Sequence, residues 1–343
     1  MVDLRRAVNG GDDVIVIAEA GVNHNGSAEL AHQLIDVAVA SGADFVKFQT
    51  FEPSKLVAKG TAAAPYQKER GATTQSDLLE QLALAPSVWG ELKDHAESQG
   101  IGFLSTPFDL DSAHLLADLG VRAMKVSSGE LTNIPFLRAI ADMGVDMLVS
   151  TGMGTEDEVL RAADATSAAD FVGFFHCVSS YPAPVEQCNL TAIPALANLL
   201  GRPVGWSDHT PGIESAMVAA ALGARLFEKH FTLDRTMEGP DHQASLEPSA
   251  LTDYVDGLRA VPLMLGDGVK RRMPAEEVNA TLVRRSWHAA RPLAAGHVIT
   301  ADDLIALRPE AGVSPYIDLV GATVTTSISG GSAITVDAIS LSA

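Results

Sequence analysis

The segment VIVIAEA, residues Val14 to Ala20, decides the fold, because it is a short run of apolar and β-branched residues that carries a carboxylate near its end. It is followed by the turn GVNHNG and then by helical apolar spacing from about Ala28 to Ser41. A continuous apolar run is typical of a strand buried on both faces, and a helix directly after it is typical of a βα unit. The fold therefore depends on how often this unit recurs.

The strand pattern recurs seven more times, and segments with helical spacing lie between the strands. Eight βα units in about 265 residues predict a TIM (β/α)8 barrel. An open doubly wound sheet is the alternative, because periodicity does not give strand order, although its GxGxxG fingerprint is absent after the first strand. The segment Glu52 to Asp77 is interpreted as a long loop at the rim. The seven further predicted strands are Phe45–Gln49, Ile101–Ser105, Arg122–Val126, Met147–Ser150, Phe171–His176, Pro203–Ser207 and Arg225–Glu228.

Composition narrows the class of protein. The 343 residues contain 24 Lys and Arg against 43 Asp and Glu, a net charge of −19, which argues against a nucleic-acid or anionic-membrane partner. The start of the chain lacks the apolar core of a signal peptide, and no apolar run is long enough to span a bilayer. Cys177 and Cys188 fit neither a disulfide framework nor a CxxC site. We expect a cytoplasmic enzyme.

The character of the chain changes after the eighth unit. Residues 1–268 are predicted to form the barrel and residues 269–285, with a basic patch, to form a linker. Residues 286–343 carry short β-type runs and turns without a long helix, which predicts a small β-rich domain. So small a core gains stability by docking on another surface.

Polar side chains gather where the predicted strands end. The carboxyl ends of the strands form the catalytic face of a TIM barrel, so a polar residue at every such end predicts an active site there. In strand order, the polar residues are Glu19, Asn23 and His24; Lys47 and Gln49; Ser105 and Thr106; Lys125, Ser127 and Ser128; Ser150 and Thr151; His176; Ser207 and His209; Glu228 and His230.

Two of these histidines predict a metal site. His209 and His230 follow consecutive strands, and Glu19 and Asp241 are expected nearby. Two imidazoles with carboxylate and water ligands suit Mn, Mg or Co better than a closed zinc site, and they leave positions open for substrate.

Two lysines occupy strand positions that usually hold Val or Ile. Lys47 and Lys125 are interpreted as a cradle for a phosphate and a carboxylate, assisted by the hydroxyl groups of neighbouring strand ends. Buried ion pairs with Glu19 or Glu228 are the simpler alternative, and a Schiff-base lysine is a weaker one.

Longer stretches of the chain resemble the sialic acid synthases, and the match covers nearly the whole chain in order. The tail from about Trp287 resembles their C-terminal domain, which is similar to type III antifreeze protein. The motifs are EAGVNHNG (Glu19 to Gly26), KFQTF (Lys47 to Phe51), YQK (Tyr66 to Lys68), STPFD (Ser105 to Asp109), KVSSGE (Lys125 to Glu130), STGM (Ser150 to Met153), HCVSSYP (His176 to Pro182), GWSDHT (Gly205 to Thr210) and the stretch from Glu228 to Pro248.

The resemblance implies an activity and a division of roles. The activity is metal-dependent condensation of phosphoenolpyruvate with N-acetylmannosamine or a related N-acylated aldose, giving a nine-carbon 2-keto acid and phosphate. His209 and His230 are implied as metal ligands, and Glu19, Tyr181 and Asp241 as residues facing the sugar or a metal-bound water. Tyr66 is a further expected substrate contact. Glu19 or Glu228 is expected to stabilise the positive charge that forms at C2 of phosphoenolpyruvate, and Glu19 is the preferred general base. The residues implied to hold phosphoenolpyruvate are Lys47, Gln49, Thr106, Lys125, Ser128, Ser150 and Ser207.

The resemblance also implies a homodimer in which the small domain reaches over the barrel of a partner subunit. The arginine involved matches Arg308 in the motif LRPEAG. Three alternatives stay open: a legionaminate-type synthase that uses a 2,4-diacetamido-trideoxyhexose, a pyruvate-dependent aldolase on the same barrel, and a non-enzymatic ice-binding or carbohydrate-binding protein.

Overall fold

The computed structural model describes residues 4–7, 13–58 and 75–341. Two compact units make up the chain, Met1–Gly266 and Asp267–Ala343. Within the described residues, no helix is both long enough and apolar enough to cross a membrane.

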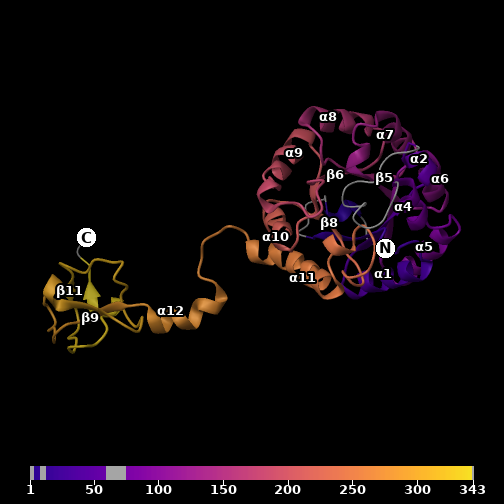
Figure 1. Ribbon diagram of the computed structural model, residues 1–343. Helices are drawn as coiled ribbons and strands as arrows, with labels where there is room; N and C mark the ends of the chain where they lie inside the picture. The colour runs from indigo at the N-terminus through magenta and orange to yellow at the C-terminus, as the bar shows by residue number, and fades with distance from the viewer. Residues whose placement is uncertain (1–3, 8–12, 59–74, 342–343) are drawn as a thin grey trace. The chain divides into compact units, whose positions relative to one another are not determined.

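The first unit is a closed barrel in which eight parallel strands pair in chain order. Figure 1 shows its helices as a ring around the strands. The predicted TIM barrel is therefore confirmed, and the open doubly wound sheet is excluded. The strands are β1 (Ile15–Gly21), β2 (Phe45–Thr50), β3 (Gly102–Pro107), β4 (Ala123–Val126), β5 (Asp146–Ser150), β6 (Val172–His176), β7 (Val204–Asp208) and β8 (Leu226–His230).

The surrounding helices begin at residues suited to helix N-termini. The Ser27 side chain accepts a hydrogen bond from the backbone of Leu30, and the Asp109 side chain accepts one from Ser112, so each satisfies an otherwise unpaired amide. Within residues 4–7, 13–58 and 75–266, the α-helices are α1 (Ala28–Ala40), α2 (Pro53–Leu56), α4 (Gln75–Leu82), α5 (Val88–Ser98), α6 (Leu110–Asp118), α7 (Ile134–Ala141), α8 (Glu156–Ala165), α9 (Ala192–Leu200), α10 (Glu214–Ala221) and α11 (Pro248–Leu265).

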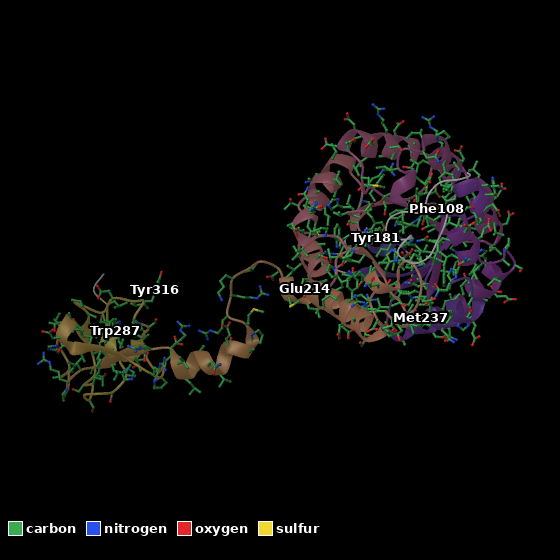
Figure 2. The ribbon with its side chains drawn as sticks, viewed as in Figure 1. Phe108, Tyr181, Glu214, Met237, Trp287 and Tyr316 are labelled. Atoms are coloured by element: carbon green, nitrogen blue, oxygen red, sulfur yellow. The ribbon has the colours of Figure 1, made fainter. Side chains whose placement is uncertain are left out.

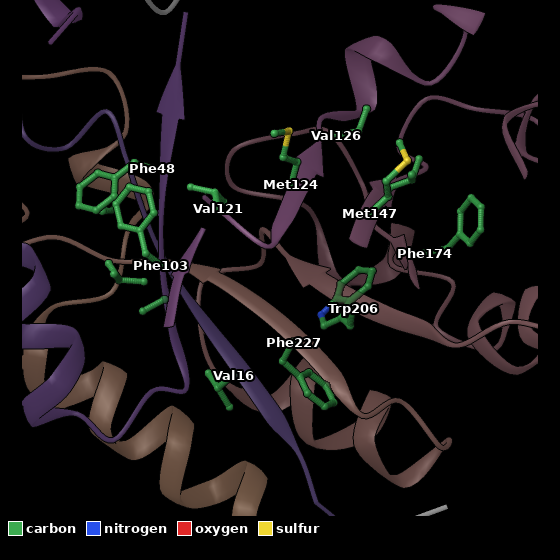
Figure 3. Packing of buried hydrophobic residues seen from close by; sticks show 14 of the residues in the cluster. Val16, Phe48, Phe103, Val121, Met124, Val126, Met147, Phe174, Trp206 and Phe227 are labelled. Atoms are coloured by element: carbon green, nitrogen blue, oxygen red, sulfur yellow. The ribbon is translucent and has the colours of Figure 1, made fainter. Parts of the chain in front are cut away.

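The barrel wall has two faces, because successive side chains of a strand point to opposite sides. Outward-facing side chains such as Phe48, Trp206 and Phe227 pack with the helices in the main core (Figure 3). Inward-facing strand side chains, together with Leu4 from the short 3-10 helix before β1, form a second, smaller core that fills the barrel interior. This inner core, called the floor below, consists of Leu4, Ile15, Ile17, Phe45, Leu104, Ala123, Leu148, Phe175 and Leu226.

The rim after β2 differs from the predicted long loop. Helix α2 lies near the start of that segment, and α4 begins at Gln75 and continues beyond its end. Leu82, in the last turn of α4, is buried. This apolar contact stabilises the helix, which the polar composition of the segment did not predict. Residues 59–74, which include Tyr66, lie outside the described residues.

The second unit contains two antiparallel strand pairs, and the helix α12 (Glu277–Val283) lies within the predicted linker. Asp303 is buried, and its carboxylate accepts hydrogen bonds from Arg291 at 2.8 Å and His297 at 2.7 Å. A buried charge that is fully paired helps to define so small a core. The strands are β9 (Ser286–Ala289), β10 (Leu304–Leu307), β11 (Thr323–Val324) and β12 (Ile339–Ser340).

Candidate active site

Four charged side chains meet directly above the floor. Lys47 Nζ lies 2.8 Å from Glu19 Oε2 and 3.7 Å from Glu228 Oε2, and Lys125 Nζ lies 2.9 Å from both carboxylate oxygens of Glu228. All four side chains are buried. Their register explains the meeting, because Glu19 lies opposite Lys47 on β2 and opposite His230 on β8. The ion pairs considered as the simpler alternative are thus present.

The surroundings shift the pKa values of the two carboxyl groups, Glu19 and Glu228, in opposite directions. Burial raises the pKa of Glu19 to about 7, although Lys47 opposes this shift. Burial alone would also raise the pKa of Glu228, but Lys125 and Lys47 outweigh it and lower that pKa to about 2. Two carboxyl groups with widely separated pKa values are suited to different tasks, one carrying a proton and one holding a fixed negative charge.

The lysines respond to the same neighbours in opposite directions. Burial disfavours the charged form of Lys47, but Glu19 and Glu228 outweigh it and raise the lysine pKa. Burial lowers the pKa of Lys125, and the attraction of Glu228 only partly offsets this effect. The four groups therefore form one coupled cluster.

Inward-facing hydroxyl and amide groups surround this cluster. Lys47 donates to Thr106 Oγ1 at 2.9 Å, Ser207 donates to Glu228 Oε1 at 3.0 Å, and Gln49 donates to Glu19 Oε1 at 3.3 Å. Ser150 is buried at the end of β5. These four residues were predicted at the substrate site, and the structure places them at the same end of the barrel.

Ser128 marks a second contact region beside the cluster. Its Oγ accepts a hydrogen bond from the backbone of Gly152 at 3.0 Å and lies 3.2 Å from Cys177 Sγ. A Cβ at Gly152 would clash with Ser179 Oγ and come within 2.8 Å of Ser128 Oγ and 2.9 Å of Cys177 Sγ, so a larger residue there would displace these side chains. Ser127, one of the polar residues predicted at the end of this strand, has a buried hydroxyl without a partner in the described chain. Its position two residues after Lys125 is the sequence signal for it.

His209 and His230 lie beside each other at the mouth of the barrel. Their ring centroids are 5.9 Å apart, and Tyr181 packs on His209 at 4.2 Å and edge-on to His230 at 5.7 Å. Figure 2 shows Tyr181 within the ring of helices. Burial lowers the pKa of His209 to about 3 and also lowers that of His230, so both imidazoles are neutral at pH 7.

The histidine pair fits a metal ion through the donors that it offers. His209 Nδ1 is 2.7 Å from the carbonyl oxygen of Val178 and must donate to it, so Nε2 carries a lone pair, with Ser207 Oγ 3.4 Å away. His230 Nδ1 is buried without a hydrogen-bond partner in the described chain, and Asp241 Oδ2 lies 3.9 Å from it. Among the described residues, no group of three His, Cys, Asp or Glu side chains is arranged to hold a metal. Glu19 and Asp241 therefore do not complete a three-ligand protein shell with the histidines, contrary to expectation.

Three residues predicted at the site, Ser105, Thr151 and His176, instead form hydrogen bonds within the barrel wall. Ser105 Oγ lies 2.7 Å from Thr50 Oγ1, Thr151 donates to the carbonyl of Phe175 at 2.9 Å, and His176 Nε2 lies 2.8 Å from the carbonyl of Cys188. All three belong to the outward-facing set, because Leu104, Ser150 and Phe175, next to them along the chain, face inward. The expectation that every strand end contributes to the site was wrong for these residues.

Two further predictions are not tested by the barrel. Tyr66 lies outside the described residues, and Arg308, which is exposed, belongs to the second unit.

The barrel carries paired lysines and carboxylates above its floor and two neutral histidines at its mouth. This arrangement is typical of TIM-barrel enzymes that form or cleave carbon–carbon bonds, the synthases and aldolases. Comparison with known proteins narrows this class. The NeuB family matches residues 34–270, and the SAF domain matches residues 284–340. The chain belongs to the NeuB family, which confirms the resemblance to the sialic acid synthases and an enzyme of that type.

Individual relatives cover almost all of the chain. The N,N'-diacetyllegionaminic acid synthase of Campylobacter jejuni is 40% identical over 319 residues, covering 91% of this chain and 96% of its own length. The enzyme of the same name from Legionella pneumophila is 41% identical over 329 residues, covering 93% and 92%. The crystal structure of the N-acetylneuraminic acid synthetase of Leptospira borgpetersenii is 32% identical, with a TM-score of 0.71 over 78% of this chain and 91% of that one.

Proposed function

We propose that this enzyme condenses phosphoenolpyruvate with an N-acylated aldose and water to give a nine-carbon 2-keto sugar acid and phosphate. The observation that carries the proposal is the cluster of Lys47, Lys125, Glu19 and Glu228 at the base of a barrel mouth that also holds two neutral histidines. Two cations side by side suit a substrate with both a phosphate and a carboxylate, which a pyruvate-dependent aldolase does not require.

The preferred aldose is a 2,4-diacetamido-trideoxyhexose, the legionaminate-type alternative. N-acetylmannosamine, the first expectation from the motifs, is the second candidate. The order follows from the two relatives at 40% and 41% identity, both of which are named N,N'-diacetyllegionaminic acid synthases.

Each charged residue has a task in this reaction. Lys47 and Lys125 bind the anionic groups of phosphoenolpyruvate, and the hydroxyl of Thr106, which accepts from Lys47, donates a further hydrogen bond to them. Ser207 would donate to them by turning its hydroxyl away from Glu228. Glu228, which stays ionised, stabilises the positive charge that develops at C2 after C3 attacks the aldehyde. Glu19, with a pKa of about 7, accepts the proton of the water that adds to C2 and passes a proton to the alkoxide that the aldehyde leaves. The tetrahedral phosphate ester then collapses: its C2–O bond to the phosphate breaks, the C2 hydroxyl loses its proton to the departing phosphate, and the 2-keto acid is formed.

His209 and His230 would hold a divalent metal ion, Mn with Mg or Co as alternatives, and the ion would supply a positive charge for the aldehyde oxygen of the sugar. Their neutral state and the oriented Nε2 of His209 support this assignment. Tyr181 and Asp241, next to the histidines, would contact the sugar.

The test is a substrate panel with the purified protein. Phosphoenolpyruvate is combined with N-acetylmannosamine, the 2,4-diacetamido-trideoxy relative and the corresponding altrose isomer, and phosphate release and product mass are recorded. We expect the fastest phosphate release with the 2,4-diacetamido sugar of manno configuration. Product formation from pyruvate without phosphate release would replace the proposal by the aldolase.

We also propose a homodimer in which Arg308 of one chain completes the site of the other. The support is its exposure in a unit with a small core of its own, and the planar guanidinium suits a carboxylate or sugar hydroxyl. Mixing the inactive variants Arg308→Ala and His230→Ala tests this, because a mixed dimer contains one site free of both lesions. Activity that never rises in a preparation shown to contain mixed dimers would exclude the shared site.

A further inference from the structure

The turn after β1 is fastened to the loop after β8 by one buried side chain. Asn23 Nδ2 donates to the carbonyl oxygen of Phe231 at 2.7 Å and to Ser245 Oγ at 3.0 Å. Asn23 is fully buried, and Ser245 is almost fully buried. Because a carbonyl oxygen can only accept, the nitrogen of the amide must face Phe231, which fixes the orientation of the Asn23 side chain.

These contacts reach two residues of the candidate site. Phe231 directly follows His230, so its carbonyl fixes the backbone at the strand end that carries this histidine. Ser245 Oγ in turn donates to the backbone carbonyl of Asp241 at 2.7 Å. A single amide group therefore restrains the backbone on both sides of the contact between His230 Nδ1 and Asp241 Oδ2, which are 3.9 Å apart.

The backbone of the loop shows why this restraint is needed. Two backbone hydrogen bonds close its base, from Thr232 to the carbonyl of Leu246 and from Leu246 to the carbonyl of His230, both 2.9 Å long. Side-chain bonds hold its outer part, among them Thr232 Oγ1 to His242 Nδ1 at 2.6 Å and Arg235 to the carbonyl of Gln243. A loop between such points keeps considerable conformational freedom unless side chains hold it. Two buried hydrogen bonds from one rigid amide remove much of this freedom near the site.

A second asparagine of the same turn contacts the outer part of the loop. Asn25 donates to the carbonyl of Glu238 at 2.8 Å, and its Oδ1 lies 3.2 Å from His242 Nε2. The side chain of Asn25 bonds the outer part of the loop, whereas Asn23 bonds Phe231 and Ser245 next to His230. The motif VNHNG thus supplies two asparagines that hold the loop after β8 by separate hydrogen bonds.

We infer that Asn23 is a positioning residue that holds His230 and Asp241 in place through Phe231 and Ser245. The inference rests on the proposed function, because it assigns to these two residues the metal and sugar side of the site. Asn23 does not touch substrate in this role. Its effect passes through the geometry of the imidazole and the carboxylate, as outer residues orient metal ligands in other proteins.

The experiment compares Asn23→Ala and Ser245→Ala with the unmodified full-length protein. The first readout is hydrogen exchange of peptides covering residues 231–247, which needs no metal. The second is the Kd for Mn²⁺, measured by calorimetry. The matched control is Thr166→Ala, which deletes a fully buried side chain that bonds the carbonyls of Ala162 and Ala163 at the end of α8.

For both test variants we expect faster exchange in residues 231–247 and Mn²⁺ binding that is weaker by about 10–100-fold. The double variant should lose less affinity than the product of the single losses, because both residues act through one chain of hydrogen bonds. The control should unfold more easily but keep the exchange of this loop and the Kd unchanged.

Unchanged exchange in folded Asn23→Ala, or faster exchange with an unchanged Kd, would overturn the inference. If Asn23→Ala does not fold, Ser245→Ala decides by the same criteria. If the unmodified protein binds no Mn²⁺, the proposed metal role fails, and the exchange data alone then support or overturn the positioning role of Asn23.

Discussion

Lys125 and Lys229 are both buried and both paired with a carboxylate, yet they lie on opposite faces of the barrel wall. Lys125 faces inward and pairs with Glu228 at 2.9 Å, above the floor. Lys229 faces outward, pairs with Asp208 at 3.1 Å and donates to the carbonyl of Thr210 at 2.5 Å, beneath helices α10 and α11. Burial and pairing therefore do not by themselves identify a functional charge. On the inward face, Lys47, Lys125, Glu19 and Glu228 lie in one coupled cluster, whereas on the outward face Lys229 has Asp208 as a fixed partner.

The largest expected effect is on metal binding and turnover, and it should distinguish the inward-facing His230 from the outward-facing His176. His230→Ala should abolish detectable Mn²⁺ binding and turnover, because it removes one of only two imidazole ligands. The outward-facing His176→Ala should keep both, since His176 bonds the carbonyl of Cys188. Calorimetry with Mn²⁺ and phosphate release measure the two properties. Full turnover of the unmodified enzyme after complete chelation would contradict the proposed metal role.

The next effect compares the two lysines directly. Lys125→Met should lower kcat/KM for phosphoenolpyruvate by about 10²–10³-fold, because it removes a cation from the anion site. The KM for the sugar should change far less. Steady-state kinetics with each substrate varied in turn provides the measurement, and equal losses for both substrates would point to a collapsed site instead.

Lys229→Met should show the reverse pattern. It leaves the buried Asp208 without its cation, which typically costs about 3–5 kcal/mol of stability. The KM for phosphoenolpyruvate should remain unchanged in the folded protein. Urea unfolding together with kinetics tests this, and a raised KM at unchanged stability would remove the distinction between the faces.

The raised pKa of Glu19 predicts a pH dependence of the enzymatic activity. As a base it acts only when ionised, so activity should rise as pH increases through about 7, and Glu19→Gln should remove this limb and lower kcat by about 10²–10⁴-fold. A pH–rate profile of both proteins tests the assignment. An unchanged profile in the variant would transfer the role of base to another group.

The same shift predicts a smaller effect on stability. Folded Glu19 keeps its proton up to about pH 7, whereas an unfolded glutamate loses it near 4.5. The contribution of this group to stability is therefore complete below pH 4.5 and is lost as pH rises through 7. Urea unfolding at pH 5 and pH 8 should show a decrease for the unmodified protein that is smaller for Glu19→Gln, and equal decreases would contradict it.

The sequence predicted the barrel and most of the inward-facing site because both depend on local patterns. Eight apolar runs gave the strands, and charged residues such as Lys47 and Glu228 interrupt these runs at one end. Ser105, Thr151 and His176 were misassigned because a polar residue at the carboxyl end of a strand can still face outward, toward the helices. Leu104 and Phe175 beside them give the alternation that would have corrected this.

Other features depend on distant contacts that no local pattern contains. The carbonyl of Val178 that orients His209 is a backbone group and leaves no mark in the amino-acid sequence. The buried anchor of α4 likewise depends on neighbours from other parts of the barrel. The contact between Asn23 and Ser245 joins residues 222 positions apart.

The apolar floor also has a kinetic consequence. Side chains such as Ile17, Leu148 and Phe175 fill the barrel below the charged cluster, so among the described residues the cluster faces the mouth. A molecule bound at the histidines then lies across the path to Lys47 and Lys125. We expect compulsory order, with the anionic substrate entering first and the sugar second, so a dead-end sugar analogue should be uncompetitive against phosphoenolpyruvate; competitive inhibition would show that the two enter independently.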